Sequence, residues 1–477
     1  MKDKLFYMGI FVYIFAFLYF YPSFFSIADE NAYLAGISFL TEGEVSTYDI
    51  FKSYYSADLP DSDKFVPAYQ LGNSVIILPF AMIDWRLIFL SGLIFHLLNL
   101  WIFVKILKKY GLNKRYGLLY LLYPGFIFYS RTVMSEIPTI TFTLLGFYFY
   151  LSEKKNSKLL AGLMLGISCL LRLTNGLLLI GFMIIPLYKT IRNLFKGKSW
   201  FNKDIKLFLE IFTGALPSLL LILAFNYFAY DGIFNTRYAG GGTNVYYYML
   251  GFGISKFSNL MILWKPLLIL CTIYPLMGIS PFLGKYNKKA EIILITILSL
   301  LVFGKIDVFR YSWLINFTVG HRYFFSIIPL LLIPYSLFLN KYFKKLVSIS
   351  IISLMIITPL IMYEQSLYTD TKYEVMKQIY AVVPDSELIV IEGDPQYLNY
   401  FFGNNSIMRF HNSNQLDFSK QFYLVEFGNQ DLMLNLKNVG ELQDLEHERD
   451  AFSEFIEITN TSIIYNHNNL RIYSNLP

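Results

Sequence analysis

The sequence predicts an α-helical polytopic membrane protein with about 11 transmembrane helices and a small extracytoplasmic α/β domain at the C-terminus. Of its 477 residues, 55% are hydrophobic and only 16% are charged, and the mean hydropathy is +0.46. Apolar runs long enough for a helix to cross hydrocarbon recur over residues 1–363. This composition excludes a soluble globule, and nothing in it indicates nucleic-acid binding.

Eleven apolar runs account for the predicted spans. They cover residues 5–22, 86–107, 115–130, 137–151, 158–172, 174–189, 207–229, 260–283, 290–304, 322–340 and 346–363. The first run lacks a small-residue cleavage site, which favours a retained helix over a cleaved signal peptide. Both cysteines, Cys169 and Cys271, lie inside apolar runs, so the sequence predicts neither a disulfide framework nor a metal cluster built on cysteine.

The distribution of charge predicts the orientation of these spans. If the spans alternate, the segments on the side of the N-terminus hold 22 Lys and Arg residues against five acids, a net charge of +17. The long first loop, residues 23–85, has a net charge of −7, and the tail, residues 364–477, has −10. Because basic loops stay in the cytoplasm, we expect the N-terminus inside and both acidic segments outside.

The first outer loop is too long to be a simple connection. Residues 27–40 predict a short helix along the membrane interface, with Tyr33, Ile37 and Leu40 facing lipid. Residues 65–83 are apolar but interrupted by proline and glycine, which indicates an interfacial or re-entrant helix. The alternative, a twelfth span, would invert every later loop and place the basic clusters outside.

The tail differs in composition from the rest of the chain and predicts a soluble α/β domain. A helix is expected over residues 368–383 and a polar helix near 441–455. Strands are expected over residues 387–392, 422–426, 462–465 and 470–473.

Charged or densely polar groups recur where predicted spans end on the outer side. They are Asp29-Glu30, Tyr129 to Glu136, Arg172 to Asn175, Tyr230 to Thr243, and His321 to Tyr323. Placing two adjacent carboxylates at the end of a transmembrane span costs free energy, so such a pair is expected to have a function. Because all five places fall on one side, we expect a single outward-facing cavity.

Arginine suits phosphate, because its planar fork makes bidentate, charge-assisted hydrogen bonds. Arg131, Arg172 and Arg322 are therefore candidate phosphate ligands. The alternative is that each of them extends to the interface only to solvate its charge. His321 has a similar alternative as a packed or headgroup-facing histidine.

Several motifs occur in a fixed order and on one predicted side. They are Asp29-Glu30 followed by Tyr33; Phe65-Val66-Pro67-Ala68-Tyr69; Tyr123-Pro124-Gly125-Phe126 leading to Ser130-Arg131-Thr132 and Ser135-Glu136-Ile137-Pro138; a small-residue helix, Gly162 to Arg172; and Arg322-Tyr323 before Pro329. In this arrangement the first 340 residues or so resemble the GT-C superfamily of polytopic glycosyltransferases, which includes protein O-mannosyltransferases and aminoarabinose transferases. Glu136 stands where some relatives have aspartate.

The resemblance implies transfer of a sugar from a polyprenyl-phosphate donor to a lipid, glycan or protein acceptor, with residues 1–363 as the catalytic domain. It implies Asp29 as the base that takes the acceptor proton, with Glu30 or Glu136 orienting either the acceptor or Asp29. Arg131, Arg172, Arg322 and His321 would contact the donor phosphate, and Tyr33, Tyr69, Arg237 and Tyr323 would line the site. Some GT-C enzymes use a divalent metal ion and others do not; Asp29 and Glu136 are the candidate ligands here.

Three other functions compete with this interpretation. A transporter would show inverted repeats and ionisable residues near the bilayer midplane, and the sequence has neither. A polymerase or ligase of lipid-linked polysaccharide would share the donor and the outer arginines, but usually places its long loop late in the chain. A non-catalytic membrane protein would use the tail to bind a partner. The expected location is the cell membrane, or the endoplasmic reticulum of a eukaryote, with the active site outside the cytoplasm.

Overall fold

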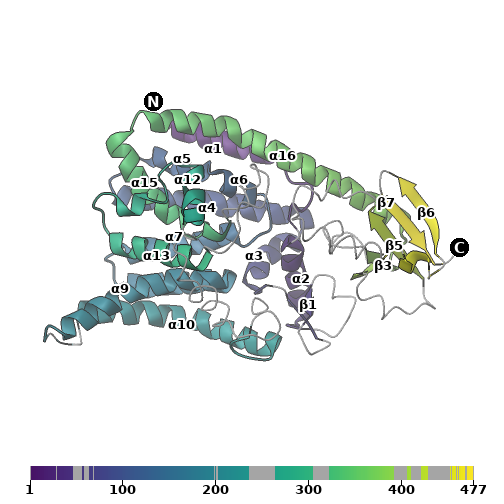
Figure 1. Cartoon of the computed structure of the whole chain (residues 1–477), viewed down its shortest axis with the longest axis horizontal. Coiled ribbons are helices and arrows are strands. Elements are labelled where there is room, and N and C mark those ends of the chain that lie inside the picture. The colour runs from purple at the N-terminus through teal and green to yellow at the C-terminus, as the bar shows by residue number, and fades with distance from the viewer. Residues whose placement is uncertain are drawn as a thin grey trace.

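A helical bundle with a small sheet at one end forms the structure, a computed structural model (Figure 1). It describes residues 2–27, 29–46, 56–58, 64–67, 69–197, 199, 202–235, 264–303, 322–391, 405–409, 421–427, 452, 454–457, 459, 461–467 and 470–475. The helices in these ranges are α1 Lys2–Tyr19, α2 Asp29–Glu42, α3 Gly72–Ala81, α4 Ile88–Lys109, α5 Gly117–Leu121, α6 Pro124–Tyr129, α7 Glu136–Tyr150, α8 Ser157–Leu171, α9 Gly176–Leu194, α10 Lys203–Tyr230, α12 Trp264–Thr272, α13 Lys289–Phe303, α15 Ile328–Tyr342 and α16 Leu346–Val382.

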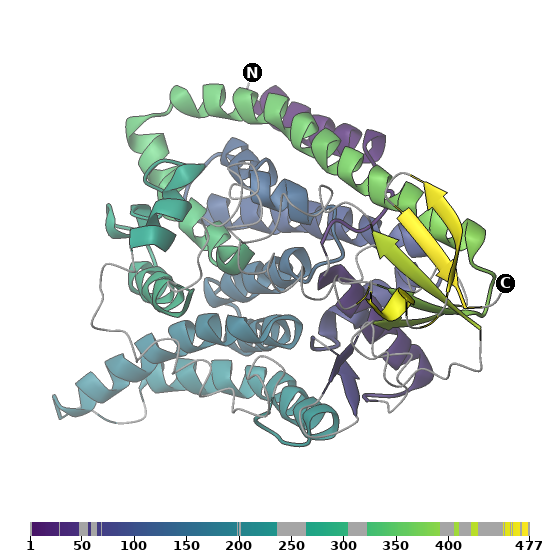
Figure 2. The same ribbon diagram turned by 45° about the vertical axis from the view of Figure 1, so that its right-hand side comes forward.

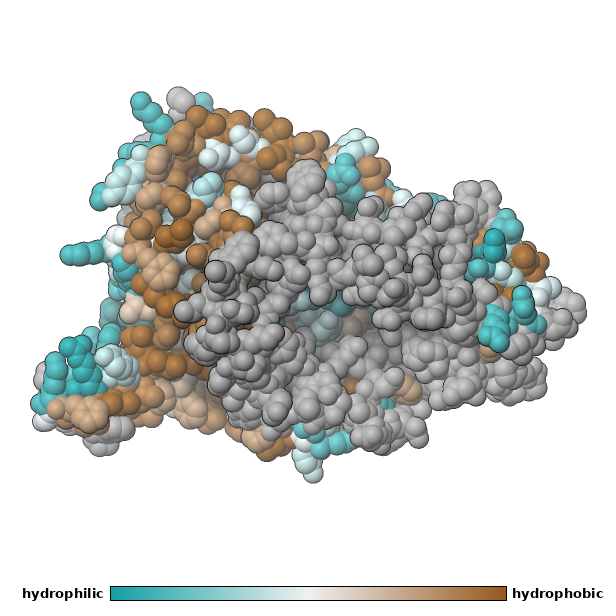
Figure 3. All heavy atoms as spheres, viewed as in Figure 1, coloured by the Kyte–Doolittle hydropathy of each residue, from teal (hydrophilic) through white to brown (hydrophobic). Residues whose placement is uncertain are grey.

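Each predicted span contains a helix, and the described helices support a multi-pass membrane protein. Four helical segments are long and apolar enough to cross a bilayer: Trp85–Lys109, Leu173–Leu194, Lys203–Tyr230 and Leu346–Val382. The predicted span 115–130 is divided into α5 and α6, because Pro124 begins a new helix. A brown hydrophobic band with hydrophilic side chains along its edge marks the surface in Figure 3, as expected of helices that face lipid.

Helices α8 and α10 pack with their backbones unusually close. A Cβ atom added at Gly162 of α8 would lie 2.0 Å from the carbonyl oxygen of Ile211, and one at Gly214 of α10 would lie 2.0 Å from that of Leu159. Small residues at such contacts let transmembrane helices approach closely and pack well without any hydrophobic driving force. The small-residue character of residues 162–172 is therefore explained by this interface.

We expect Gly162→Ala to destabilise the protein by about 1–3 kcal/mol, because the new methyl group must push two backbones apart. Thermal unfolding of the detergent-purified chain measures the loss as a fall in Tm. Gly176→Ala is the matched control, since nothing lies within 4 Å of the Cβ position at Gly176. Equal Tm values for the two variants would show that the α8–α10 contact is looser than described.

The two helices of the first loop differ in part from the expectation. The predicted helix over 27–40 is present as α2, but Tyr33 and Ile37 are 5% and 2% exposed, so the prediction that they face lipid was wrong. They are buried because α2 packs against α3, where the Ser74 hydroxyl donates a hydrogen bond to the carbonyl of Tyr33 at 2.8 Å. The amphipathic pattern predicted which face of α2 is apolar. It did not reveal that α3, and not lipid, covers that face.

The apolar segment 65–83 contains only a short helix. Strand β2 (Phe65–Pro67) pairs antiparallel with β1 (Ser56–Asp58), and α3 then covers Gly72–Ala81. A ten-residue helix is about 15 Å long, half the thickness of the hydrocarbon core. The length of α3 therefore favours the expected interfacial or re-entrant helix over a twelfth span.

The tail contains a five-stranded sheet with the order β4-β3-β5-β7-β6. The strands are β3 Leu388–Ile391, β4 Ser406–Arg409, β5 Phe422–Phe427, β6 Ser462–His467 and β7 Leu470–Ser474. Strand β3 pairs in parallel with β4 and β5, whereas β7 pairs antiparallel with β5 and β6. The four predicted strands are confirmed, and β4 was not predicted. The expected helix near 441–455 lies mostly outside the described residues.

Helix α16 joins the bundle to this sheet. It runs beside α1 and continues without a break to the sheet (Figures 1 and 2). The expected helix over 368–383 is therefore the last part of α16, and the expected boundary at 363/364 falls inside one helix. Ile379 and Val383 pack against β3, β5 and β7 together with Ala35 of α2. This shared apolar cluster ties the sheet to the first-loop helices.

Candidate active site

The link between α6 and α7, residues 130–135, is held rigidly by the two first-loop helices. The Asn73 side chain of α3 donates to the carbonyl of Val133 at 2.7 Å, and the Glu30 carboxylate of α2 accepts from the amide of Val133 at 2.7 Å. The Tyr33 hydroxyl donates to Ser135 Oγ at 2.8 Å. These bonds position the start of α7, which carries Glu136, against the start of α2, which carries Asp29.

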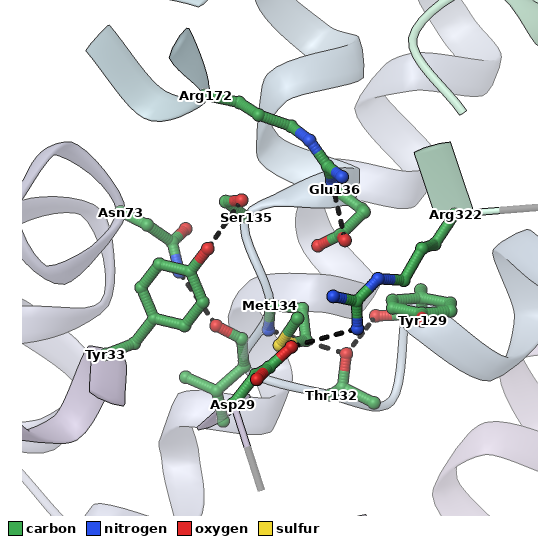
Figure 4. A network of polar contacts seen from close by, with 11 residues as sticks. Asp29, Tyr33, Asn73, Tyr129, Thr132, Met134, Ser135, Glu136, Arg172 and Arg322 are labelled. Atoms are coloured by element: carbon green, nitrogen blue, oxygen red, sulfur yellow. Dashed lines mark hydrogen bonds and ion pairs between the residues drawn. The ribbon is translucent and has the colours of Figure 1, made fainter. Parts of the chain in front are cut away.

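Asp29 forms an ion pair at the edge of this junction. Its Oδ2 lies 2.9 Å from a terminal nitrogen of Arg322, and the two side chains are 29% and 20% exposed. The Arg322 guanidinium also lies over the ring of Tyr323 at 5.1 Å and beside Tyr129 (Figure 4). Partial exposure leaves the Asp29 carboxylate accessible.

A second ion pair lies next to the first. Glu136 Oε1 is 2.6 Å from a terminal nitrogen of Arg172, which ends α8 in an extended conformation. Glu136 is only 2% exposed and lies between the guanidinium groups of Arg172 and Arg322 (Figure 4). Four segments that are far apart in the sequence therefore bring two carboxylates and two arginines into one cluster, which we call the Asp29 cluster.

Two buried atoms of the Asp29 cluster have no hydrogen-bond partner among the described residues: Oε2 of Glu136 and Nε of Arg322. More than nine in ten buried polar groups in proteins have a partner, because leaving one unpaired costs about 1–3 kcal/mol. One of these atoms is an acceptor and the other a donor. Each of them therefore has hydrogen-bonding capacity that no described residue uses.

Glu30 points away from the Asp29 cluster, because consecutive residues on a helix face directions about 100° apart. Its side chain is fully buried, and it accepts hydrogen bonds from the amides of Ser26, Ile27 and Val133 at 2.7–2.9 Å. Burial raises the pKa of the Glu30 carboxyl to about 7, although these amides and nearby Lys372 oppose the shift. Glu30 connects the start of α2 to the 130–135 link.

Arg131 also lies apart from the Asp29 cluster. Its guanidinium is fully buried, donates from Nε to Oε1 of Gln365 on α16 at 2.9 Å, and lies 5.8 Å from the ring centre of Phe17 on α1. The turn after α6 directs this side chain to the α1 and α16 side, a direction that sequence position alone does not reveal.

Among the other predicted site residues, Tyr33 stacks on Tyr69 with ring centres 5.0 Å apart. His321 and Arg237 lie outside the described residues. Sequence reasoning gave no role to Asn73, Tyr129 or Ser135, which contact or support the site (Figure 4). An asparagine within an apolar segment was the one available signal for Asn73, because a buried amide requires a partner.

The described residues contain no group of three or more His, Cys, Asp or Glu side chains that could hold a metal ion. The two candidate metal ligands, Asp29 and Glu136, are each paired with an arginine. A guanidinium beside each carboxylate opposes the binding of a second positive charge at that oxygen.

The helical bundle and its first-loop helices have a GT-C-like fold, which confirms the resemblance inferred from the motifs at the level of fold. Among solved structures, the chain is similar to ArnT from Cupriavidus metallidurans, an aminoarabinose transferase, in the apo state, with a TM-score of 0.62 at 9% identity over 99% of this chain and 97% of that one. It is also similar to the same protein bound to undecaprenyl phosphate, with a TM-score of 0.61 at 9% identity over 99% and 98% of the two chains. No family model and no curated protein sequence matches this chain.

Proposed function

We propose that this chain is an integral membrane glycosyltransferase that moves a sugar from a polyprenyl-phosphate donor to an acceptor on the extracytoplasmic face, with inversion at the anomeric carbon. The supporting observation is the Asp29 cluster, with its accessible carboxylate, its two arginines and its unpartnered donor and acceptor atoms. The solved structure of ArnT with undecaprenyl phosphate supports the same class of donor, because that protein has the same fold.

Asp29 is the proposed general base. The acceptor hydroxyl or amine gives its proton to the Asp29 carboxylate while its oxygen or nitrogen forms a bond to the anomeric carbon. The bond from that carbon to the phosphate oxygen breaks, and its electron pair leaves with the polyprenyl phosphate. A single displacement inverts the anomeric centre, as a single base and a leaving group on opposite faces of the sugar require.

Arg322 and Arg172 are the proposed partners of the phosphate. The leaving group gains negative charge as the bond breaks, and guanidinium groups already in place stabilise that charge without reorganisation. The unpartnered Nε of Arg322 is a donor for this purpose. The unpartnered Oε2 of Glu136 is a hydrogen-bond acceptor for a hydroxyl of the sugar or the acceptor.

The geometry leads us to change two proposed roles. Glu30 becomes a positioning residue, since all three of its hydrogen bonds go to backbone amides that orient Asp29 and the 130–135 link. Arg131 becomes a structural residue between α6 and α16. Among the described residues, the catalytic and phosphate-binding set is then Asp29, Glu136, Arg172 and Arg322, and His321 stays a candidate phosphate ligand outside them.

The experiment that tests the function uses the purified chain in proteoliposomes with a panel of undecaprenyl-phosphate-linked sugars and a lipid extract as the source of acceptor. Release of undecaprenyl phosphate measures transfer. Release that depends on both the protein and the acceptor extract supports the proposal. If no donor of the panel releases undecaprenyl phosphate while the protein remains folded, the proposed function is wrong.

The proposed topology has eleven spans, with the N-terminus inside and α16 ending outside. We expect a membrane-impermeant maleimide to label Glu374→Cys in intact cells, and Lys155→Cys only after permeabilisation, because both side chains are exposed but lie at opposite ends of the bundle. The reverse pattern would show that the charge asymmetry had been assigned to the wrong side.

A further inference from the structure

A pocket with charged and polar side chains in its lining lies at the end of the bundle opposite the Asp29 cluster. It has a volume of about 640 Å³, and it is lined by Lys109, Tyr110, Tyr148, Leu151, Ser152, Glu153, Lys154 and Asn287. Helix α7 starts at Glu136 in the Asp29 cluster and ends two residues after Tyr148, so its 15 residues separate the two places by roughly 22 Å. We call it the Lys109 pocket, and it is separate from the proposed site of sugar transfer.

Three chain segments converge on the Lys109 pocket, and each of them is basic. They are the end of α4, the link between α7 and α8, and the link before α13, all assigned to the cytoplasmic side from their charge. Nearby Lys158 and Lys288 are already engaged: Lys158 donates to the carbonyls of Tyr150 and Ser152, and Lys288 lies 3.8 Å from Glu291. The lysines that line the pocket are Lys109 and Lys154.

Glu153 and Lys154 both lie within electrostatic range of Lys109: the carboxylate attracts its ammonium group and Lys154 repels it. Lys109 donates to the carbonyl of Tyr148 at 3.1 Å, and among the described residues no side chain accepts a hydrogen bond from Lys154. Glu153 is the one acid of the lining, and it is exposed. Two ammonium groups and one carboxylate leave the pocket with a net positive charge that an anion would neutralise.

One face of α4 carries aromatic and basic side chains that lead to the Lys109 pocket. Trp101, Lys105 and Lys109 follow one another at four-residue spacing on one face of α4. Trp101 is 55% exposed, as expected for an aromatic residue at the membrane interface, and the Lys105 ammonium lies 3.3 Å from its ring centre. Phe282 and Leu283 are exposed on the segment that leads to Asn287. Exposed apolar side chains therefore lie on two of the segments that lead to the pocket lysines.

We propose that the Lys109 pocket binds the phosphate headgroup of an anionic phospholipid from the leaflet opposite the Asp29 cluster. Lys109 and Lys154 contact the phosphate, the tyrosine hydroxyls and Ser152 contact the glycerol oxygens, and the acyl chains follow the apolar face that includes Trp101. Basic pockets between transmembrane helices on the cytoplasmic side hold anionic headgroups for the same electrostatic reason.

The test is native mass spectrometry of the detergent-purified chain titrated with 1-palmitoyl-2-oleoyl-phosphatidylglycerol. Each lysine near a membrane phosphate contributes roughly fivefold in affinity, so the double variant Lys109→Gln/Lys154→Gln is expected to bind about 25-fold more weakly than the wild type. Glu153→Gln is expected to bind more tightly, because it removes the one repelling charge of the lining. Both changes lie on exposed side chains and leave the helices intact.

Lys189→Gln/Lys196→Gln is the matched control, since it removes two exposed lysines from the same end of the bundle but outside the pocket. We expect it to bind phosphatidylglycerol like the wild type, and phosphatidylcholine with the same chains to bind weakly to every variant. If the control variant loses as much affinity for phosphatidylglycerol as the pocket variant, the lipid responds to general surface charge and the proposal is wrong. Competition by glycerol 3-phosphate at the same concentration as the lipid would also overturn it, because the site would then select a soluble phosphate.

Discussion

Asp29→Asn is expected to lower sugar transfer by about 10²–10⁴-fold, the contribution of a positioned general base, while leaving the binding of undecaprenyl phosphate intact. The amide is nearly the same size as the carboxylate but cannot accept the acceptor proton. Donor binding persists because Arg322 and Arg172 keep their charges. Release of undecaprenyl phosphate measures transfer, and native mass spectrometry measures donor binding.

The control is Asp84→Asn, which makes the same change on an exposed aspartate at the start of α4. Asp84 caps a short helix by accepting from the Arg86 amide, and asparagine can do the same. We expect transfer by this variant at the wild-type rate. Wild-type transfer by Asp29→Asn would exclude Asp29 as the base, and loss of both transfer and donor binding would point to a structural role instead.

Arg322→Gln is expected to lower transfer by about 10²–10³-fold, the typical effect of removing one donor that stabilises developing charge. Donor binding should also weaken, because the glutamine side chain lacks the positive charge that attracts the phosphate. Arg322→Lys should recover part of the transfer rate and part of the donor affinity, since lysine restores the positive charge but not the planar guanidinium group. The two readouts are the rate of undecaprenyl phosphate release and the affinity for undecaprenyl phosphate.

Arg86→Gln provides the matched control for this experiment. Arg86 is another arginine at the same end of the bundle as the Asp29 cluster, but its guanidinium lies 5.5 Å from the ring centres of Trp85 and Tyr373. It should affect neither rate nor donor affinity. An Arg322→Gln variant that binds and transfers like wild type would remove Arg322 from the phosphate site and leave Arg172 as the remaining candidate.

The sequence predicted the helices because hydrocarbon imposes a length and an apolar composition that local residues alone must meet. It predicted β3, β5, β6 and β7 because each is a short run of β-branched and aromatic residues. Strand β4 was missed, since Ser406–Arg409 has little such pattern and is stabilised by pairing in parallel with β3. A pairing of that kind is a property of the folded sheet and leaves no local signal.

The residues of the candidate site were also partly predictable from local sequence. A charged residue at the end of an apolar run is visible in the sequence, so Asp29, Glu136, Arg172 and Arg322 could each be identified. Their common side followed from the alternation of spans. The direction of each side chain was not available, which is why Glu30 and Arg131 were placed with them although both point into packed parts of the bundle.

The sequence by itself determined that this is a chain of apolar helices with acids and arginines at one set of helix ends. A bilayer requires apolar helices, and it penalises charged residues inside them. Only the tertiary structure decided which charges meet. The bonds from Asn73, Glu30 and Tyr33 to the 130–135 link join residues 60 to 103 positions apart and aim Asp29 at Arg322 and Glu136 at Arg172. Such long-range pairing depends on the packing of whole helices, and residue types and their spacing do not encode it locally.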